Sequence, residues 1–164
     1  MQTQVMFYLL KDELKVEGTD ETENDTRSAL YHACLQASYF YRQKQRVYIY
    51  TQDQQHAEQV DEMLWAFDSD SFVPHNLVGE GPKQGAAVEI GFQAPQGRRQ
   101  VLINLTSTVP NFANQFQFIV DFVPSDEALK QQARERFKTC RQWGFQVDNQ
   151  AVPVPGSVSK EASN

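Results

Sequence analysis

Three histidines are the first side chains of this 164-residue sequence to consider for catalysis or metal binding. His32, His56 and His75 stand at no recognisable metal-ligand spacing, and no serine or cysteine lies in a nucleophile motif such as GxSxG. His75 lies between Pro74 and Asn76, a setting more typical of a residue that ties a loop by hydrogen bonds than of an acid–base catalyst. We therefore expect no metal and no other cofactor.

The acidic residues give little support to a catalytic mechanism. Asp61 and Glu62 are adjacent, so on a helix they point in different directions and do not form a carboxylate pair. Two-metal nuclease chemistry needs several converging acids, whereas the predicted strands contain only Glu89 and Asp121.

Two cysteines, Cys34 and Cys140, lie far apart in the sequence and outside any CxxC motif. This spacing predicts neither a disulfide framework nor a zinc site. We expect both to be reduced thiols packed in helices, as in a cytoplasmic protein.

Charge is unevenly distributed along the chain. It has 15 Lys and Arg against 21 Asp and Glu, a net charge of −6. Residues 128–143 hold five cations and one acid, a local +4, so the remainder carries −10. An acidic body argues against a general nucleic-acid coat or a polybasic membrane binder. No run approaches the roughly 18 apolar residues of a membrane helix, and no signal-type segment opens the chain, so we expect a soluble, unexported protein.

The basic segment has helical periodicity with two distinct faces. At 100° per residue, one face is apolar and the cations form a stripe along its flank, with Phe137 at the border. The apolar face comprises Leu129, Ala133, Phe137 and Cys140, and the stripe comprises Lys130, Arg134, Lys138 and Arg141. Such a stripe could form the rim of a groove for a short ligand with carboxylates and a hydrophobic side chain. A solvated helix face whose cations offset acids elsewhere would look the same.

Bulky apolar residues form a second unusual group. Trp65-Ala66-Phe67 ends a predicted helix, and Phe72-Val73-Pro74 lies in a predicted loop, where residues are normally polar. Either they fill the core beneath the loop, or some of them anchor another protein. Position alone favours the core.

The elements that must position these residues alternate between strand and helix. We expect an exposed acidic connection over 12–25, helices over 26–41, 53–65 and 127–143, and a short helix over 111–118. We expect strands over 5–10, 46–50, 87–92, 100–105, 119–123 and 145–147, with the first covered on both faces, and a long loop over 72–82. This order predicts a single-domain, mostly parallel, doubly wound (Rossmann-like) α/β sheet with helices on both faces. The predicted domain covers residues 1–147, followed by a flexible tail over 148–164.

This fold class often binds nucleotides, but the glycine-rich phosphate motif is missing. The connection after the first strand contains seven acids and one glycine, which would repel a phosphate. The other glycine-rich segment, residues 79–82, precedes a strand rather than a helix. An α/β enzyme acting on a nucleotide or phosphorylated metabolite is therefore the alternative, not the first, interpretation.

Several segments together resemble the chi subunits of bacterial DNA polymerase III holoenzymes. The central ones are DEMLWA at 61–66, SFVPHNL at 71–77 and GEGP at 79–82. In the C-terminal half they are VDFVP at 120–124, LKQ at 129–131 and ARERFK at 133–138, followed by Arg141 and GF at 144–145. FYLL at 7–10 also fits, so the resemblance covers residues 5–147. It does not cover the acidic connection or the tail.

The resemblance implies a noncatalytic adaptor of the clamp-loader assembly. It implies a one-to-one complex with the psi subunit and a separate contact with the acidic C-terminal tail of single-stranded DNA-binding protein, so that DNA is reached only indirectly. The family's tail-binding positions fall on Val123, Lys130, Arg134, Phe137, Lys138 and Arg141, and the psi or partner patch on Trp65, Phe72, Val73 and Pro74. Phe137 stands where the family often has tyrosine, so only the apolar contact is expected there. A direct single-stranded DNA binder remains a third interpretation.

Overall fold

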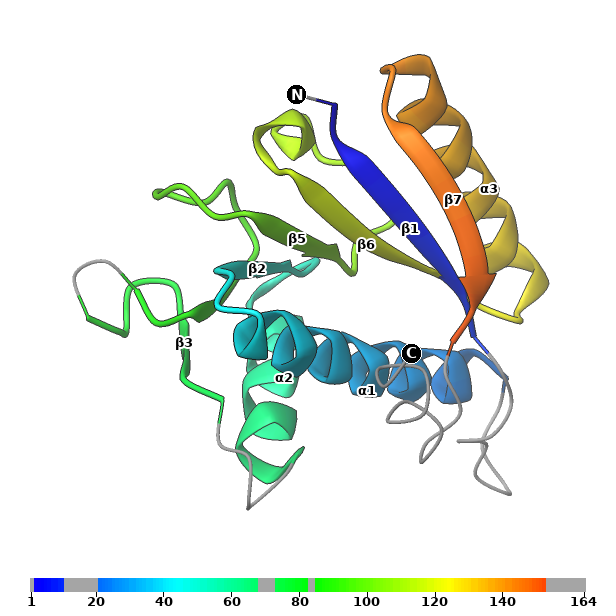
Figure 1. Cartoon of the computed structure of the whole chain (residues 1–164). Coiled ribbons are helices and arrows are strands. Elements are labelled where there is room, and N and C mark those ends of the chain that lie inside the picture. The colour runs from blue at the N-terminus through cyan, green and yellow to red at the C-terminus, as the bar shows by residue number, and fades with distance from the viewer. Residues whose placement is uncertain (1, 11–20, 68–72, 83–84, 153–164) are drawn as a thin grey trace.

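A seven-stranded, all-parallel β-sheet forms the centre of the computed structural model (Figure 1). The structure describes residues 2–10, 21–67, 73–82 and 85–152. Along the sheet the strand order is β3-β4-β2-β5-β6-β1-β7. The strands are β1 (Gln4–Leu9), β2 (Val47–Tyr50), β3 (His75–Leu77), β4 (Val88–Gly91), β5 (Val101–Asn104), β6 (Phe118–Val123) and β7 (Gln146–Ala151).

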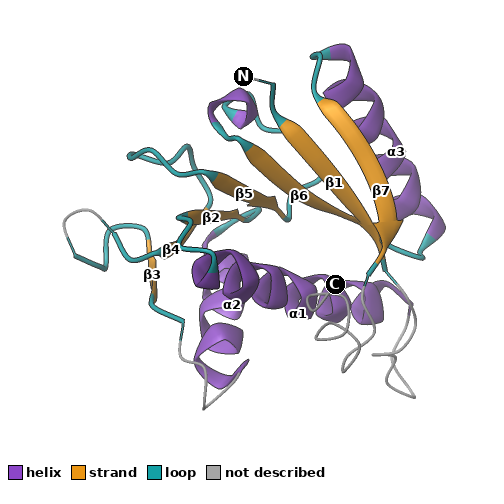
Figure 2. Ribbon diagram, in the orientation of Figure 1, coloured by secondary structure: helices purple, strands orange, loops and turns teal. Residues whose placement is uncertain are grey.

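Helices cover both faces of this sheet (Figure 2). They are α1 (Glu21–Arg42), α2 (Gln54–Phe67) and α3 (Glu127–Gln142), with a short 3-10 helix, η2 (Ala113–Gln115). Successive residues of a strand point to opposite faces. Accordingly Val101 and Ile103 of β5 join the core beneath α1 and α2, whereas Leu102 joins the core on the side of α3 and η2. The doubly wound α/β prediction is confirmed.

Three elements differ from the sequence-based expectation. Helix α1 begins at Glu21, five residues early, inside the acidic connection; acids in a first helical turn are favoured by the helix dipole. Strand β3 lies inside the expected loop and is only three residues long. The expected helix over 111–118 is only the 3-10 turn η2, ended by the extended backbone of Phe116.

The last strand runs past the predicted domain boundary at residue 147. Strand β7 continues to Ala151 and pairs with β1 along its whole length, and Val152 after it is buried. A strand was expected over 145–147, but its polar extension Asp148-Asn149-Gln150 lies at the sheet edge, where side chains are exposed, and this polarity concealed the extension in the sequence. The remainder of the predicted tail lies outside the described residues.

Both cysteines are buried in helices, as predicted. Cys34 of α1 and Cys140 of α3 belong to the cores on opposite faces of the sheet, and burial raises the pKa of each thiol to about 12. Within the described part of the chain, none of the helices has the length and apolar character needed to cross a membrane.

Candidate functional site

Helix α3 carries the predicted basic stripe, and its first turn is firmly anchored. The Asp126 side chain caps the helix by accepting a hydrogen bond from the Leu129 N–H at 3.1 Å. The carboxylate of Asp25 in α1 accepts bonds from the Ser125 N–H and hydroxyl and, at 2.7 Å, from the Asp126 N–H. These bonds fix the start of α3 against α1.

A buried ion pair holds the inner face of α3 on the sheet. The Arg136 guanidinium contacts the Asp121 carboxylate of β6 through Nε and Nη2, both at 3.0 Å, and donates to the Phe122 carbonyl at 3.0 Å. Arg136 is 7% exposed and Asp121 2%. Arg136 therefore belongs to the core, although it contributes to the +4 charge of segment 128–143.

The four stripe cations lie outside this buried face. Arg134, Lys138 and Arg141 are exposed and Lys130 is half-buried. Glu127 lies 3.8 Å from Lys130 Nζ and 3.9 Å from Arg134 Nη1, distances at which exposed pairs contribute little stability. Among the described residues, no ion pair involves Lys138 or Arg141. The C-terminal half of the stripe therefore offers two cations that are not engaged in an ion pair with those residues.

Apolar side chains border the stripe. Phe137 of α3 and Val123 at the end of β6 are both half-buried and pack against the same core cluster. The Phe137 ring lies 5.3 Å from the ring of Phe7. Val123 is also the register partner of Leu9 in β1, and Leu9 is 40% exposed.

Leu9 is an addition to the site that the sequence did not suggest. Its run, residues 5–10, predicts a strand covered on both faces. Strand alternation places Leu9 on the same face as Val5 and Phe7, the α3 face, beside Val123. An exposed leucine there extends the apolar border beyond the two predicted residues.

The second predicted patch is divided between surface and core. Trp65, in the last turn of α2, is 62% exposed, and its ring packs edge-on against His75 at 4.8 Å. Pro74 is half-buried, whereas Val73 is 3% exposed and belongs to the core beneath α1 and α2. Val73 is therefore not on the partner surface, and Phe72 lies outside the described residues.

His75 has the loop-tying role that the sequence favoured. It is buried, with Nδ1 2.7 Å from the Val73 carbonyl oxygen and Nε2 3.4 Å from Asp61 Oδ1. Through these contacts it fixes the segment before β3 to α2, and it supports the exposed ring of Trp65.

The chain is thus a three-layer α/β protein whose surface carries a cationic helix, α3, and an exposed tryptophan, Trp65, at the end of α2. A crystal structure of T4 UvsW shares this fold, with a TM-score of 0.58 and 10% identity over 92% of this chain. The chain spans 41% of that longer protein, so the likeness concerns the fold alone.

Sequence comparison then gives the family. The family model "DNA polymerase III chi subunit, HolC" matches residues 1–148. The chain is 42% identical over 144 residues to DNA polymerase III subunit chi of Escherichia coli K12, covering 87% of this chain and 93% of that protein. It is 40% identical to the Haemophilus influenzae chi subunit, covering 80% and 92%, and 31% identical to that of Pseudomonas aeruginosa, covering 79% and 90%. The chain belongs to the DNA polymerase III chi subunit family.

It is thus a noncatalytic accessory subunit of the DNA polymerase III holoenzyme, which acts in DNA replication. The resemblance found in the sequence is confirmed. The roles of the individual stripe and tryptophan-patch residues remain predictions.

Proposed function

We propose that this chi subunit links the polymerase III clamp loader to single-stranded DNA-binding protein. In this proposal, helix α3 binds the acidic C-terminal tail of that protein, and the surface around Trp65 and Pro74 contacts the psi subunit. The observation that carries the first part is the stripe of four cations beside a half-buried apolar border.

Charge complementarity supports binding of the acidic tail to the stripe. Lys138 and Arg141 form no ion pair among the described residues, so they can pair with peptide carboxylates without displacing an internal partner. Lys130 and Arg134 would exchange Glu127 for the peptide at little cost, because those contacts are long and solvent-exposed. Cations spaced over α3 can therefore bind several acidic groups and a terminal carboxylate.

The apolar border supplies the second half of the recognition. Phe137, Val123 and Leu9 are partly exposed and lie on the same side of the sheet, so a hydrophobic side chain at the end of the tail would be buried against them. Phe137 offers no hydroxyl, so its contribution is apolar contact only.

Affinity is expected to be modest and sensitive to salt. Each exposed charge contact contributes only about 0.2–1 kcal/mol and is screened by added ions. Many tails on one coated DNA strand would raise the effective concentration and compensate for a weak single contact. The chain would then reach DNA in the cytoplasm through the coating protein.

The psi contact is supported by exposure and chemistry. Trp65 is 62% exposed although tryptophan is costly to leave in water, and it is a residue type favoured at the centres of interfaces. It lies near β3 and Pro74, whereas the stripe belongs to α3 at the other end of the strand order, so both partners could bind together (Figure 1).

Calorimetry with a nine-residue acidic tail peptide tests the tail site. Arg134→Ala should weaken binding by about two- to fivefold, the equivalent of one exposed charge contact, and leave the fold unchanged. Arg98→Ala removes an exposed cation in the segment between β4 and β5 and serves as the matched control. Unchanged affinity of the Arg134 variant, or equal losses in both variants, would reject this site. An oligonucleotide that binds through Arg134 would instead identify the stripe as a DNA site.

A further inference from the structure

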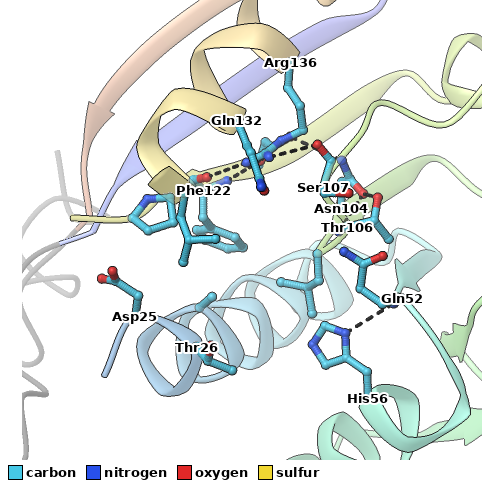
Figure 3. Close-up of a pocket in the computed structure, with 15 residues that line it drawn as sticks. Asp25, Thr26, Gln52, His56, Asn104, Thr106, Ser107, Phe122, Gln132 and Arg136 are labelled. Atoms are coloured by element: carbon cyan, nitrogen blue, oxygen red, sulfur yellow. Dashed lines mark hydrogen bonds and ion pairs between the residues drawn. The ribbon is translucent and has the colours of Figure 1, made fainter. Parts of the chain in front are cut away.

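A pocket of about 220 Å³ lies at the carboxyl ends of β2, β5 and β6, on neither of the two proposed protein-binding surfaces (Figure 3). The segments that follow these strands line it, together with the N-terminal parts of α1, α2 and α3. Parallel α/β sheets characteristically bind ligands outside the carboxyl ends of their strands. The position of this pocket alone makes it a candidate ligand site.

Helix α3 separates the pocket from the basic stripe. Gln132 and Arg136 line the pocket. At 100° per residue they lie at least 120° around the helix from every stripe cation, on the other flank of the apolar face. A ligand in the pocket would therefore leave Arg134 and Lys138 free, and this inference does not depend on the proposed tail site.

The two carboxylates of the pocket are already engaged. Asp25 accepts three hydrogen bonds from Ser125 and Asp126. Asp121 is paired with Arg136 and also accepts from the Asn104 amide and the Phe122 N–H. Among the described residues that line the pocket, no carboxylate is therefore left for a metal or a cationic ligand, and Asp121 balances the charge of Arg136.

Hydrogen-bond donors remain available. The Arg136 guanidinium has five N–H groups, and four are used by Asp121, Phe122 and Ser107, which leaves one on Nη1. His56 Nδ1 accepts a bond from the Gln52 N–H at 3.2 Å, so the ring proton is placed on Nε2. Burial lowers the pKa of His56, partly offset by Asp53, so the ring is neutral near pH 7.

Two carboxamides and an apolar floor complete the site. Gln52 and Gln132 are exposed at the pocket, and within the described residues their side chains make no hydrogen bond. Ala29, Leu105 and Phe122 also line the pocket and supply its apolar surface, with the Phe122 ring visible among the labelled side chains (Figure 3). The described residues of the lining hold two carboxylates against one guanidinium, which disfavours an anion. Hydrogen-bond donors beside apolar surface suit an uncharged molecule with carbonyl acceptors.

We propose that this pocket binds a nucleobase, held by the amides of Gln52 and Gln132 and by the remaining donors of Arg136 and His56. Glutamine amides pair with base edges, and apolar side chains hold the faces of a base taken out of its stack. A phosphate is a poorer fit because Arg136, the only cation among the described residues that line the pocket, is neutralised by Asp121. The base could come from a free nucleoside or from an unpaired position of a strand.

Amide chemical shifts of the full-length, ¹⁵N-labelled chain test the proposal. Thymidine should shift the resonances of residues 52–56, 105–107 and 129–132 in a saturable way, and 2-deoxyribose 5-phosphate, which has no base, should not. If a short oligothymidylate binds at these amides more tightly than thymidine, the natural ligand is a base of a nucleic-acid strand. That contact would add to the indirect link to DNA through single-stranded DNA-binding protein. If the two affinities are equal, the natural ligand is a free nucleoside.

Matched variants of neighbouring glutamines give the control. Gln132→Leu removes a pocket amide and should weaken thymidine binding by about tenfold. Gln131→Leu makes the same change one residue away, outside the pocket, and should leave the affinity unchanged. The proposal is overturned if thymidine gives no saturable shifts, if the sugar phosphate shifts the same amides equally, or if both leucine variants behave alike.

Discussion

Replacing Arg136 by methionine should destabilise the protein far more than replacing any stripe cation. Methionine can follow the course of the arginine stem, but it leaves the Asp121 carboxylate buried at 2% exposure without its counter-ion. It also removes the bonds to the Phe122 and Ser107 carbonyls. Loss of one partner of a buried ion pair costs about 3–5 kcal/mol, whereas an exposed pair contributes about 1 kcal/mol at most. Urea denaturation followed by circular dichroism measures this difference.

The loss should depend on pH in a defined direction. Burial raises the pKa of Asp121, and Arg136 opposes that shift, so the variant's folded-state pKa should rise further above the unfolded value. A carboxyl group with a raised folded-state pKa does not lower the unfolding free energy at pH values below its unfolded-state pKa. The loss of unfolding free energy grows as pH rises from the unfolded-state pKa towards the folded-state pKa. The variant should therefore lose less stability, relative to the parent, at pH 5 than at pH 8.

A double variant separates the ion pair from general packing damage. Asp121→Asn combined with Arg136→Met removes both charges and should be more stable than Arg136→Met alone by about 1–3 kcal/mol, because no carboxylate is left buried without a counter-ion. A loss below about 1 kcal/mol for the single variant, the value of an exposed pair, would refute the reasoning. Equal losses at the two pH values, or a double variant no more stable than Arg136→Met alone, would refute it as well.

Three further outcomes are expected. Asp126→Ala removes the α3 cap and should lower the unfolding free energy by about 1 kcal/mol, measured in urea. Asp148→Ala, which removes an exposed carboxylate of β7, is the control and should change it by less than about 0.5 kcal/mol; equal losses would contradict the capping role. Trp65→Ala should leave the melting temperature within a few degrees of the parent, because the ring is largely exposed. The same variant should no longer copurify with psi, and retention of psi would refute the proposed psi contact at Trp65. Cys34 and Cys140 should be unreactive towards a thiol reagent at pH 8 in the native state, since their pKa of about 12 leaves almost no thiolate. Both should react after unfolding, and fast labelling of the native protein would contradict their burial.

Elements with a strong periodic pattern were predictable from the sequence. The α3 pattern located both the apolar face and the stripe, because helix geometry depends only on spacing. The apolar strands β2, β5 and β6 were equally clear. By contrast, β3 is three residues long and the second half of β7 is polar. Both are held by pairing, with β4 and β1 respectively, and partners distant in sequence leave no local signal.

Individual side-chain roles were harder to predict than elements. Arg136 looks like another surface cation, and only its distance to Asp121 reveals that it is buried. Val73 and Trp65 look equivalent as bulky residues near a loop, yet one is in the core and the other at the surface. The pocket was also beyond prediction, because it joins residues of α1, α2 and α3 that are far apart in the sequence.

The position of β1 in the sheet has a consequence for how the chain folds during synthesis. Strand β1 is made first, yet its two neighbours, β6 and β7, begin at residues 118 and 146. At 5–20 residues per second, it waits roughly 5–20 s for its first partner to be translated. Meanwhile β2, β4 and β5 can already pair with one another, so the half of the sheet beside Trp65 can assemble before α3 exists. An apolar nascent strand exposed for that long is a natural substrate for a chaperone, and premature termination after β5 should leave an aggregation-prone fragment.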